Sequence, residues 1–259
     1  MFYLGLDVGS ASSKVVIINE NDEILASCVV QAGTGSSGPS RALDEALHKL
    51  ELKPEDINTT VATGYGRYAY DKADKQISEI TCHAKGIFHL VPTTRTIIDI
   101  GGQDAKAIGL DERGSVSQFF MNDKCAAGTG RFLDVMARVL EIDISEMEVY
   151  DSKASEVTSV SSTCTVFAES EVISHLSNNV PKENIIAGIH ASVASKACSL
   201  AYRTGIKEDI VMAGGVARNS GVVRAISREL GKPVLVAPNP QITGALGAAL
   251  FAKELNSKN

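Results

Sequence analysis

The chain has 259 residues, of which 44% are hydrophobic and 22% are charged, and its formal net charge is −6. This length suffices for one large or two medium hydrophobic cores, and we expect two domains. The acidic balance, with no run of basic residues, excludes the electrostatic footprint that a nucleic acid or an anionic membrane surface would require.

The first residues, Met1-Phe2-Tyr3-Leu4-Gly5, enter a strand pattern at once, without a basic segment followed by an apolar one. No apolar stretch approaches the length needed to span a bilayer, so we expect a cytoplasmic protein. The five cysteines argue against a disulfide framework in that compartment. Three of them, Cys28, Cys82 and Cys198, fall in predicted strands or helices, where a free cysteine packs as a small apolar residue.

A strand–loop–strand pattern opens the chain and occurs a second time. The predicted strand at residues 3–6 runs into Asp7-Val8-Gly9-Ser10-Ala11-Ser12-Ser13-Lys14, and another strand follows at residues 15–18. The second copy has a strand at 96–98, then Asp99-Ile100-Gly101-Gly102-Gln103-Asp104-Ala105-Lys106, then a strand at 107–110. Each copy continues through a turn into a third strand. This duplication predicts two similar domains that face one another.

The two loops have the residue types of a phosphate-binding site. Glycine allows the backbone to approach a phosphate, while N–H groups and the hydroxyls of Ser10, Ser12 and Ser13 can donate hydrogen bonds and Lys14 adds positive charge. The carboxylates of Asp7, Asp99 and Asp104 suit a hydrated Mg²⁺ ion that bridges phosphate oxygens. Gln103 is placed to orient an attacking water. Asp7, Gln103 and Asp104 are therefore the candidate catalytic residues, and Asp7 and Asp99 the candidate magnesium ligands.

Two further cysteines, Cys125 and Cys164, each stand directly in front of a predicted helix start, in Asn122-Asp123-Lys124-Cys125-Ala126-Ala127-Gly128-Thr129-Gly130 and Ser161-Ser162-Thr163-Cys164-Thr165-Val166. A helix start presents free N–H groups and the positive end of the helix dipole, which favour a thiolate and suit metal binding. Two thiolates are half of a four-cysteine site. If a second copy of the chain supplies the other half, the site lies on a two-fold axis.

The rest of the chain adds a core helix and a third glycine site. Residues 185–203 have apolar side chains at helical spacing, so we expect a core helix in which His190 is structural, after a surface loop at residues 151–155. Gly214 and Gly215 follow a buried strand and precede a helix, as expected where an adenosine lies against bare backbone. The last helix, from residue 242, has many small residues, which suit either a domain hinge or tight packing.

These elements, in this order, resemble the acetate and sugar kinase/Hsp70/actin superfamily. Within it, residues 61–67, 99–104, 122–134 and 161–176 resemble the activators of 2-hydroxyacyl-CoA dehydratases. The resemblance implies an α/β fold with two RNase H-like (actin-like ATPase) domains, duplicated and separated by a nucleotide cleft. Domain I would comprise residues 1–94 plus 242–259, and domain II, with the cluster cysteines, residues 95–241.

The resemblance also implies an ATP-dependent electron donor. One [4Fe-4S] cluster would be shared by a homodimer through Cys125 and Cys164, a reduced ferredoxin or flavodoxin would supply the electron, and a 2-hydroxyacyl-CoA dehydratase would receive it. Such a protein is oxygen-sensitive and serves anaerobic amino-acid fermentation. Glu169 and Glu171 could line the site, relay a conformational shift to Cys164, or remain solvated without a function. The implied ATP/ADP contacts are Asp7, Gly9, Ser10, Ala11, Ser12, Ser13, Lys14, Gly101, Gly102, Gln103, Asp104, Gly214, Gly215, Asn219, Pro238 and Gln241, of which the last two could equally form a proline-bounded turn.

Two other functions use the same loops. A small-molecule kinase of the sugar or pantothenate type would need an acceptor pocket and a general base, and would leave the two cysteines without a role. A regulatory or chaperone-like ATPase could use them for packing or for zinc, since zinc also accepts four thiolates at a dimer interface. Iron and sulfide content distinguishes these possibilities.

Overall fold

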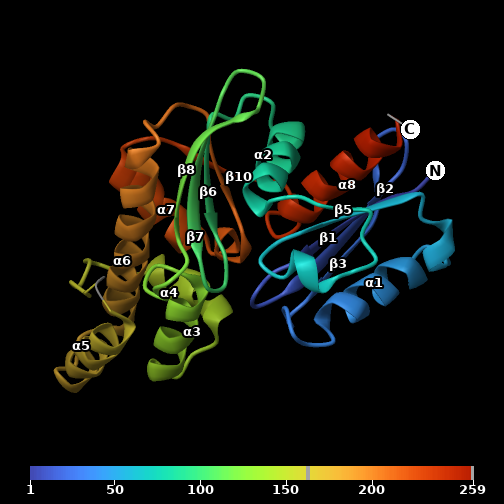
Figure 1. Cartoon of the computed structure of the whole chain (residues 1–259). Helices are drawn as coiled ribbons and strands as arrows, with labels where there is room; N and C mark the ends of the chain where they lie inside the picture. The colour runs from blue at the N-terminus through green and yellow to red at the C-terminus, as the bar shows by residue number, and fades with distance from the viewer. Residues whose placement is uncertain (162–163, 258–259) are drawn as a thin grey trace. The chain divides into compact units, whose positions relative to one another are not determined.

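Two five-stranded sheets organise the computed structural model, which describes residues 1–161 and 164–257 (Figure 1). The first sheet has the order β3-β2-β1-β4-β5, and the second has the order β10-β9-β6-β7-β8. Read from opposite edges, the two orders are equivalent. The strands are β1 (Tyr3–Val8), β2 (Ser13–Ile18), β3 (Ile24–Val30), β4 (Thr59–Thr63), β5 (Lys75–Gln76), β6 (Thr96–Ile100), β7 (Ala105–Leu110), β8 (Val116–Asn122), β9 (Ile210–Ala213) and β10 (Val234–Val236).

The predicted duplication is confirmed down to the register of the strands. β1 pairs antiparallel with β2 and parallel with β4, and β6 pairs antiparallel with β7 and parallel with β9. Asp7 lies opposite Lys14 in the first pair, and Asp99 lies opposite Lys106 in the second. The fold is therefore α/β with two related halves, as the sequence predicted.

The first compact unit comprises residues 1–94, 110–117 and the segment from Ala237 onward. Its helices are α1 (Gly38–His48), α2 (Glu79–Leu90) and α8 (Thr243–Asn256), with 3-10 turns at Pro54–Asp56 and Arg67–Ala69. Alternate strand residues face opposite sides, as the pleat requires. Leu4 and Leu6 belong to the apolar core that includes α1 residues, whereas Tyr3 belongs to the core that includes α8 residues. Accordingly α1 covers one face of the sheet and α8, beside α2, covers the other (Figure 1).

Glycine permits the close contact of α8 with its neighbours. A Cβ on Gly5 of β1 would lie 1.9 Å from the carbonyl oxygen of Ala245, and one on Gly247 would lie 1.8 Å from that of Cys82 in α2. No side chain fits at either position, because real Cβ contacts are essentially never shorter than 3.0 Å. The small residues of the last helix thus serve tight packing in this unit.

The second compact unit comprises residues 95–109 and 118–236. Its helices are α3 (Gly130–Val139), α4 (Met147–Asp151), α5 (Thr165–Ser177), α6 (Lys182–Arg203) and α7 (Ser220–Leu230), with 3-10 turns η3 (Ile144–Glu146) and η4 (Gly215–Arg218). Among the described helices, α6 alone is long and apolar enough to span a bilayer, contrary to the expectation that no stretch would be. Because 67% of its apolar window is buried, it is the predicted core helix.

The unit boundaries differ from the predicted domains in two places. The turn at residues 110–117, between β7 and β8, groups with the first unit, as do residues 237–241. The turn is held there by packing, because Gly114 lies against the ring of Phe88 of α2. The predicted surface loop at residues 151–155 is also shorter than expected, because Asp151 still belongs to α4 and is half-buried.

Candidate functional site

The first loop is built around a buried carboxylate. Asp7 is 4% exposed at the end of β1, and its Oδ2 lies 3.2 Å from Nζ of Lys14 on β2. Between them the chain turns through a hydrogen bond of 3.0 Å from the Gly9 amide to the Ser12 carbonyl. A Cβ on Gly9 would lie 2.8 Å from that same carbonyl oxygen, so the turn requires glycine. The loop thus presents backbone beside an ion pair.

The predicted hydroxyl donors of this loop have different surroundings. Ser10 and Ser12, like Ala11, are half-buried. Ser13 is fully buried, and its hydroxyl donates to the carbonyl of Ala32 over 2.8 Å. In this structure the Ser13 side chain therefore holds the following loop and does not face a ligand. The backbone of the segment remains the part suited to an anion.

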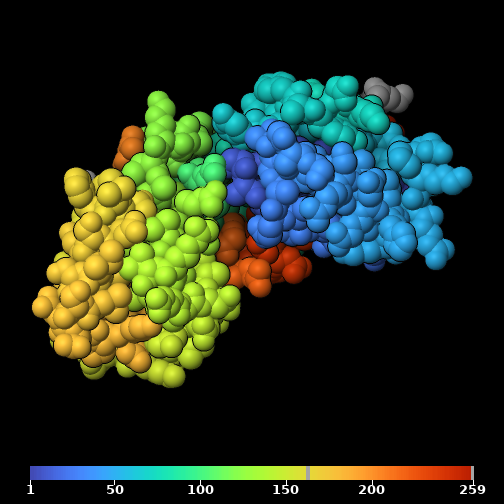
Figure 2. Space-filling model, turned by 90° about the horizontal axis from the view of Figure 1, so that it is seen from below, coloured from blue at the N-terminus to red at the C-terminus, as the bar shows by residue number. Residues whose placement is uncertain are grey.

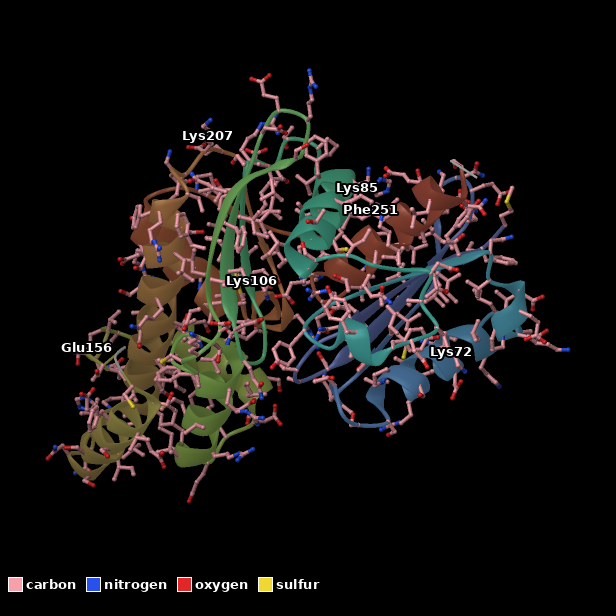
Figure 3. All side chains as sticks on the ribbon, in the orientation of Figure 1. Lys72, Lys85, Lys106, Glu156, Lys207 and Phe251 are labelled. Atoms are coloured by element: carbon pink, nitrogen blue, oxygen red, sulfur yellow. The ribbon has the colours of Figure 1, made fainter. Side chains whose placement is uncertain are left out.

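The second loop repeats the first with one more carboxylate. Lys106, on β7 (Figure 3), is 3% exposed, and its Nζ lies 3.2 Å from Asp99 Oδ2 and 2.8 Å from Asp104 Oδ2. The Gly101 amide donates to the Asp104 carbonyl over 2.9 Å, as Gly9 does to Ser12. Asp104 stands where the first loop has Ser12. Gly102 and Gln103 are exposed at the tip, where they can meet a ligand.

A second pair of equivalent glycines was not identified in the sequence. Gly64 follows β4 with φ +87°, and Gly214 follows β9 with φ +84°. A Cβ on Gly64 would lie 2.4 Å from Asp7 Oδ1, and one on Gly214 would lie 2.8 Å from Asp99 Oδ1. Each glycine therefore packs against the aspartate of its own half. The sequence signal is short, a Val-x-x-Gly in both Val61–Gly64 and Val211–Gly214.

His83 of α2 also lies close to Asp7. It is 7% exposed on α2, and its Nδ1 lies 3.0 Å from the hydroxyl of Thr243, the first residue of α8. A Cβ on Gly244 would lie 3.0 Å from His83 Nε2 and 3.3 Å from Asp7 Oδ2. The first turn of α8 thus separates the imidazole from the carboxylate.

The third glycine site lies at the start of α7. Gly214 is buried, Gly215 is exposed, and Asn219 is the N-cap of the helix. The Asn219 Oδ1 accepts hydrogen bonds from the amides of Gly221 (2.9 Å) and Val222 (3.2 Å), while the amide of Ser220 donates to Glu148 Oε2 over 3.0 Å. Because these first-turn donors are satisfied, this helix start does not attract a phosphate. The nucleoside part of a nucleotide, lying flat against Gly214 and Gly215, suits this site better than a phosphate.

The last two candidate nucleotide contacts belong to the first unit. Pro238 is exposed and Gln241 is half-buried, in the segment before α8. Asn239 between them has φ +50°, so the segment contains a tight turn. The structure describes this turn, and the contact of both residues with a nucleotide remains a prediction.

Cys125 does not precede a helix, which corrects the prediction from the sequence. Gly128 adopts a positive φ of +84°, which is incompatible with a helix that continues from Cys125. α3 therefore begins at Gly130, with Thr129 as its N-cap. The Thr129 hydroxyl and amide both donate to the Ala126 carbonyl, at 2.7 and 3.1 Å. Cys125 is exposed on the resulting turn, and the α3 dipole does not act on its thiol directly.

The first turn of α3 contacts the second loop instead. The Gly130 amide donates to the Gly101 carbonyl over 2.9 Å, and the Arg131 amide donates to the Gly102 carbonyl over 2.8 Å. A Cβ on Gly130 would lie 3.2 Å from the Gly101 oxygen, so glycine permits this approach. The turn with Cys125 is therefore joined to the second loop through one helical turn.

Cys164 is the N-cap of α5, as predicted, and its side chain makes no capping hydrogen bond. Its thiol is half-exposed. Ser162 and Thr163, which precede it in the motif, lie outside the described residues. The Ser161 amide donates to Glu171 Oε2 over 2.6 Å, so Glu171 ties the chain before Cys164 to α5. Glu169 is half-buried, with no described contact to the thiol.

Cys125 and Cys164 are accessible sulfur donors, the type of ligand that iron–sulfur clusters and zinc use. No group of three or more candidate ligands occurs among the described residues, so Cys125 and Cys164 are two accessible donors that need further ones. The other three cysteines are unsuited, because burial raises the pKa of Cys28 to about 11 and the pKa values of Cys82 and Cys198 to about 12. They remain protonated thiols, as predicted for packed residues. For Mg²⁺, the oxygens of Asp7 and Asp99 are suitable hard donors, each already beside a lysine.

The sequence matches the BadF/BadG/BcrA/BcrD ATPase family over residues 4–252. The chain is 66% identical to the activator of lactoyl-CoA dehydratase of Anaerotignum propionicum over 258 residues, which cover 100% of both chains. Its structure is similar to that of the activator of the 2-hydroxyisocaproyl-CoA dehydratase from Clostridium difficile with bound ADPNP (TM-score 0.97, 55% identity, covering 100% of this chain and 96% of that chain).

Proteins outside this family share the fold. A ROK family glucokinase from Streptomyces griseus has a TM-score of 0.61 at 12% identity, covering 98% of this chain and 100% of that chain. At that identity the likeness concerns the fold alone, and it places the two duplicated sheets among the actin-like ATPase and sugar kinase folds, as predicted. By sequence, over nearly its whole length, the chain belongs to the BadF/BadG/BcrA/BcrD ATPase family.

Proposed function

We propose that this ATPase activates a 2-hydroxyacyl-CoA dehydratase by ATP-driven transfer of one electron from a [4Fe-4S] cluster shared by two copies of the chain. The observation that carries the proposal is that Cys125 and Cys164 are both accessible thiols, whereas the other three cysteines are buried. The activator names of the full-length relatives support the dehydratase as partner. When bound, the cluster supplies a one-electron reductant of low potential.

In this proposal ATP and ADP bind through the two loops. The backbone of residues 9–12 and 101–103 holds the phosphates, and Lys14 and Lys106 are ion-paired with the carboxylates beside them. Asp7 and Asp99 bind Mg²⁺, directly or through water. Gln103 orients the attacking water, and the exposed Gly215 lies against the adenosine. The ADPNP bound to the similar activator supports this assignment.

The contact between the second loop and α3 supports coupling of the two functions. A loop that changes conformation when the terminal phosphate leaves also moves the carbonyls of Gly101 and Gly102. These carbonyls accept hydrogen bonds from the first turn of α3, which the Cys125 turn adjoins. The nucleotide can therefore alter the position of Cys125 through the second loop, the first turn of α3 and the Cys125 turn.

The surface of α5 supports association with another chain. Val166 and Phe167 are each 65% exposed, and Ile173 is 50% exposed. α5 lies at the outer surface of the second unit, where the gold atoms are seen in Figure 2. Apolar side chains gathered beside Cys164 are suited to burial against a second copy or the dehydratase. We therefore propose a cytoplasmic homodimer, with reduced ferredoxin or flavodoxin as its electron donor and no nucleic acid or membrane as partner.

The proposal is tested by anaerobic assay with a 2-hydroxyacyl-CoA dehydratase, ATP and a chemical reductant. We expect the wild-type chain to start dehydration and hydrolyse ATP. Cys164→Ser should abolish activation and retain ADP binding, because the nucleotide loops are unchanged. Formation of a phosphorylated sugar or pantothenate, with no activation of the dehydratase, would instead favour the kinase, which leaves both cysteines without a role.

A further inference from the structure

His190 of α6 is a fully buried imidazole that the proposed function does not use. It is 0% exposed, and both ring nitrogens have a polar neighbour. Nδ1 lies 3.0 Å from Asp151 Oδ1 at the end of α4, and Nε2 lies 3.1 Å from Asn219 Nδ2 at the start of α7. The imidazole therefore joins α4 to the loop that leads from β9 into α7.

The hydrogen-bond pattern fixes the state of the imidazole. Because Asn219 Oδ1 accepts two backbone amides, the atom that faces His190 is the NH₂ group, which only donates. Nε2 of His190 must then accept and carry no proton. Nδ1 carries the proton and donates it to Asp151, as in histidines oriented by a carboxylate. These hydrogen bonds select a single tautomer of His190, with the proton on Nδ1.

Asp151 is held in turn by a cation. Its Oδ2 accepts a hydrogen bond of 2.6 Å from Arg224 of α7. Burial opposes ionisation of this carboxyl, but the hydrogen bonds that it accepts from His190 and Arg224, together with the positive charge of Arg224, lower its pKa below the ordinary value. An ionised Asp151 is the partner that selects Nδ1–H on His190. Asp151 therefore sets the tautomer of His190, and that tautomer in turn accepts the hydrogen bond from Asn219.

Space around this relay of Asp151, His190 and Asn219 is also restricted. A Cβ on Gly221, in the first turn of α7, would lie 2.5 Å from His190 Nδ1. The imidazole thus occupies a fixed place between α4 and α7, and Asn219 cannot rotate without losing the cap of α7. The loop of residues 214–219 ends at Asn219 and is held at that end by the same contacts.

We propose that Asp151 and His190 are positioning residues for the adenosine of the bound nucleotide: they hold Asn219 in one orientation and so fix the 214–219 loop against which the adenosine lies. This inference rests on the proposed function, because it requires nucleotide binding at that loop. It assigns to the relay the nucleoside part of the ligand and not the phosphates, whose loops lie elsewhere in the sequence.

Asp151→Asn tests whether Asp151 sets the tautomer of His190, without changing the size of the side chain. If the new side-chain amide accepts from Arg224 through its oxygen, its NH₂ group faces His190 Nδ1, which must then accept. The proton moves to Nε2, which meets the NH₂ group of Asn219, donor against donor. The opposite orientation of the new amide sets its NH₂ group against Arg224. Either donor–donor contact weakens the hydrogen bonds that hold Asn219 and the 214–219 loop.

The measurement compares two ligands by calorimetry on the full-length protein. We expect Asp151→Asn and His190→Leu to bind ADP about ten- to hundredfold more weakly, the scale of one mispaired buried hydrogen bond, and inorganic triphosphate with unchanged affinity. His190→Gln, which can accept from Asn219 and donate to Asp151, should regain much of the ADP affinity. The matched control is Asn184→Ala, a buried polar residue on the same helix that holds residues 155 and 156 and should lower stability without changing ADP affinity.

Unchanged ADP affinity in Asp151→Asn and His190→Leu would overturn the inference. So would a parallel loss of ADP and triphosphate, because that result assigns the relay a general structural role. If the wild-type chain bound no nucleotide at all, the proposed function would fail first, and this outcome is separate from the other two.

Discussion

Lys106 is the most deeply enclosed cation of the two loops, and its removal should be costly. Lys106→Met leaves Asp99 and Asp104 without their shared cation, and breaking a buried ion pair in this way costs about 3–5 kcal/mol. The matched variant is Lys14→Met, because Lys14 is 17% exposed and serves Asp7 alone. Thermal unfolding followed by circular dichroism should show the larger loss for Lys106→Met. Equal losses of thermal stability in the two variants would contradict the prediction that the more buried lysine contributes more.

In protein prepared without metal, the five cysteines should fall into two classes by their rate of alkylation. With pKa values of about 11 to 12, the thiols of Cys28, Cys82 and Cys198 are thiolate in roughly one molecule per thousand or fewer at pH 8. Iodoacetamide at that pH should therefore modify Cys125 and Cys164 in the native protein. The other three should react only after unfolding, as mass spectrometry of peptides can show. Modification of Cys82 in the native protein would contradict the assignment.

Gly214 and Gly205 distinguish backbone strain from lack of space. Both have positive φ, but a Cβ on Gly214 would lie 2.3 Å from the Ile100 carbonyl oxygen, whereas Gly205 has nothing within 4 Å. Gly205→Ala should cost about 1–2 kcal/mol of stability from the left-handed conformation alone. Gly214→Ala should cost more and also weaken ADP binding. Chemical denaturation measures the loss of stability, and calorimetry measures the affinity for ADP. Equal stability and equal ADP affinity in the two variants would contradict this prediction.

At the scale of elements, α3 should transmit the nucleotide state to Cys125. Gly130→Pro removes the amide that donates to Gly101 at a helix position where proline is favoured, and Thr129 before it is extended, as proline requires. In the wild type without metal, we expect the alkylation rate of Cys125 to differ between ADP and a non-hydrolysable ATP analogue. The proline variant should lose most of this difference.

Gly130→Ala is the control for that variant, because it retains the amide. Its Cβ would lie 3.2 Å from the Gly101 oxygen, a tight contact that small shifts can relieve. A nucleotide-dependent rate that persists unchanged in Gly130→Pro would exclude the α3 contact as the route of coupling.

The elements show which features the sequence could predict. The short apolar runs that lead into Asp7 and Asp99 are local patterns, so the duplicated strand–loop–strand units were predicted with nearly correct bounds. Cys164 was predicted correctly for the same reason. Cys125 was not, because Gly128 adopts a positive φ that ends the apparent helix. The Thr129-Gly130 pair, a common N-cap followed by the true first residue, was the available signal.

The relay of Asp151, His190 and Asn219 could not be predicted locally. Its members come from α4, α6 and the start of α7, and each was plausible alone as a loop, core or ligand-binding residue. Only the packing of three helices brings them together. The equivalence of Gly64 and Gly214 was missed because few residues match, although strand order and φ angle make it plain in the structure.

At the scale of the whole molecule, the proposed function depends on a cluster shared between two chains. Each chain offers two accessible thiols, so a [4Fe-4S] cluster bound by four cysteines requires two chains. Iron and sulfide in the ratio of one [4Fe-4S] cluster to two chains distinguish this proposal from a kinase and from an ATPase that binds zinc at the same four thiolates. The shared cluster also explains why a chain with a complete ATPase fold keeps thiols exposed on its surface.

The most direct test is the iron and acid-labile sulfide content of anaerobically purified protein, measured together with its molar mass in solution. We expect a dimer with about two iron and two sulfide atoms per chain, which corresponds to one [4Fe-4S] cluster per pair of chains. Stable protein without iron, or about four iron atoms per chain in a monomer, would contradict the shared cluster.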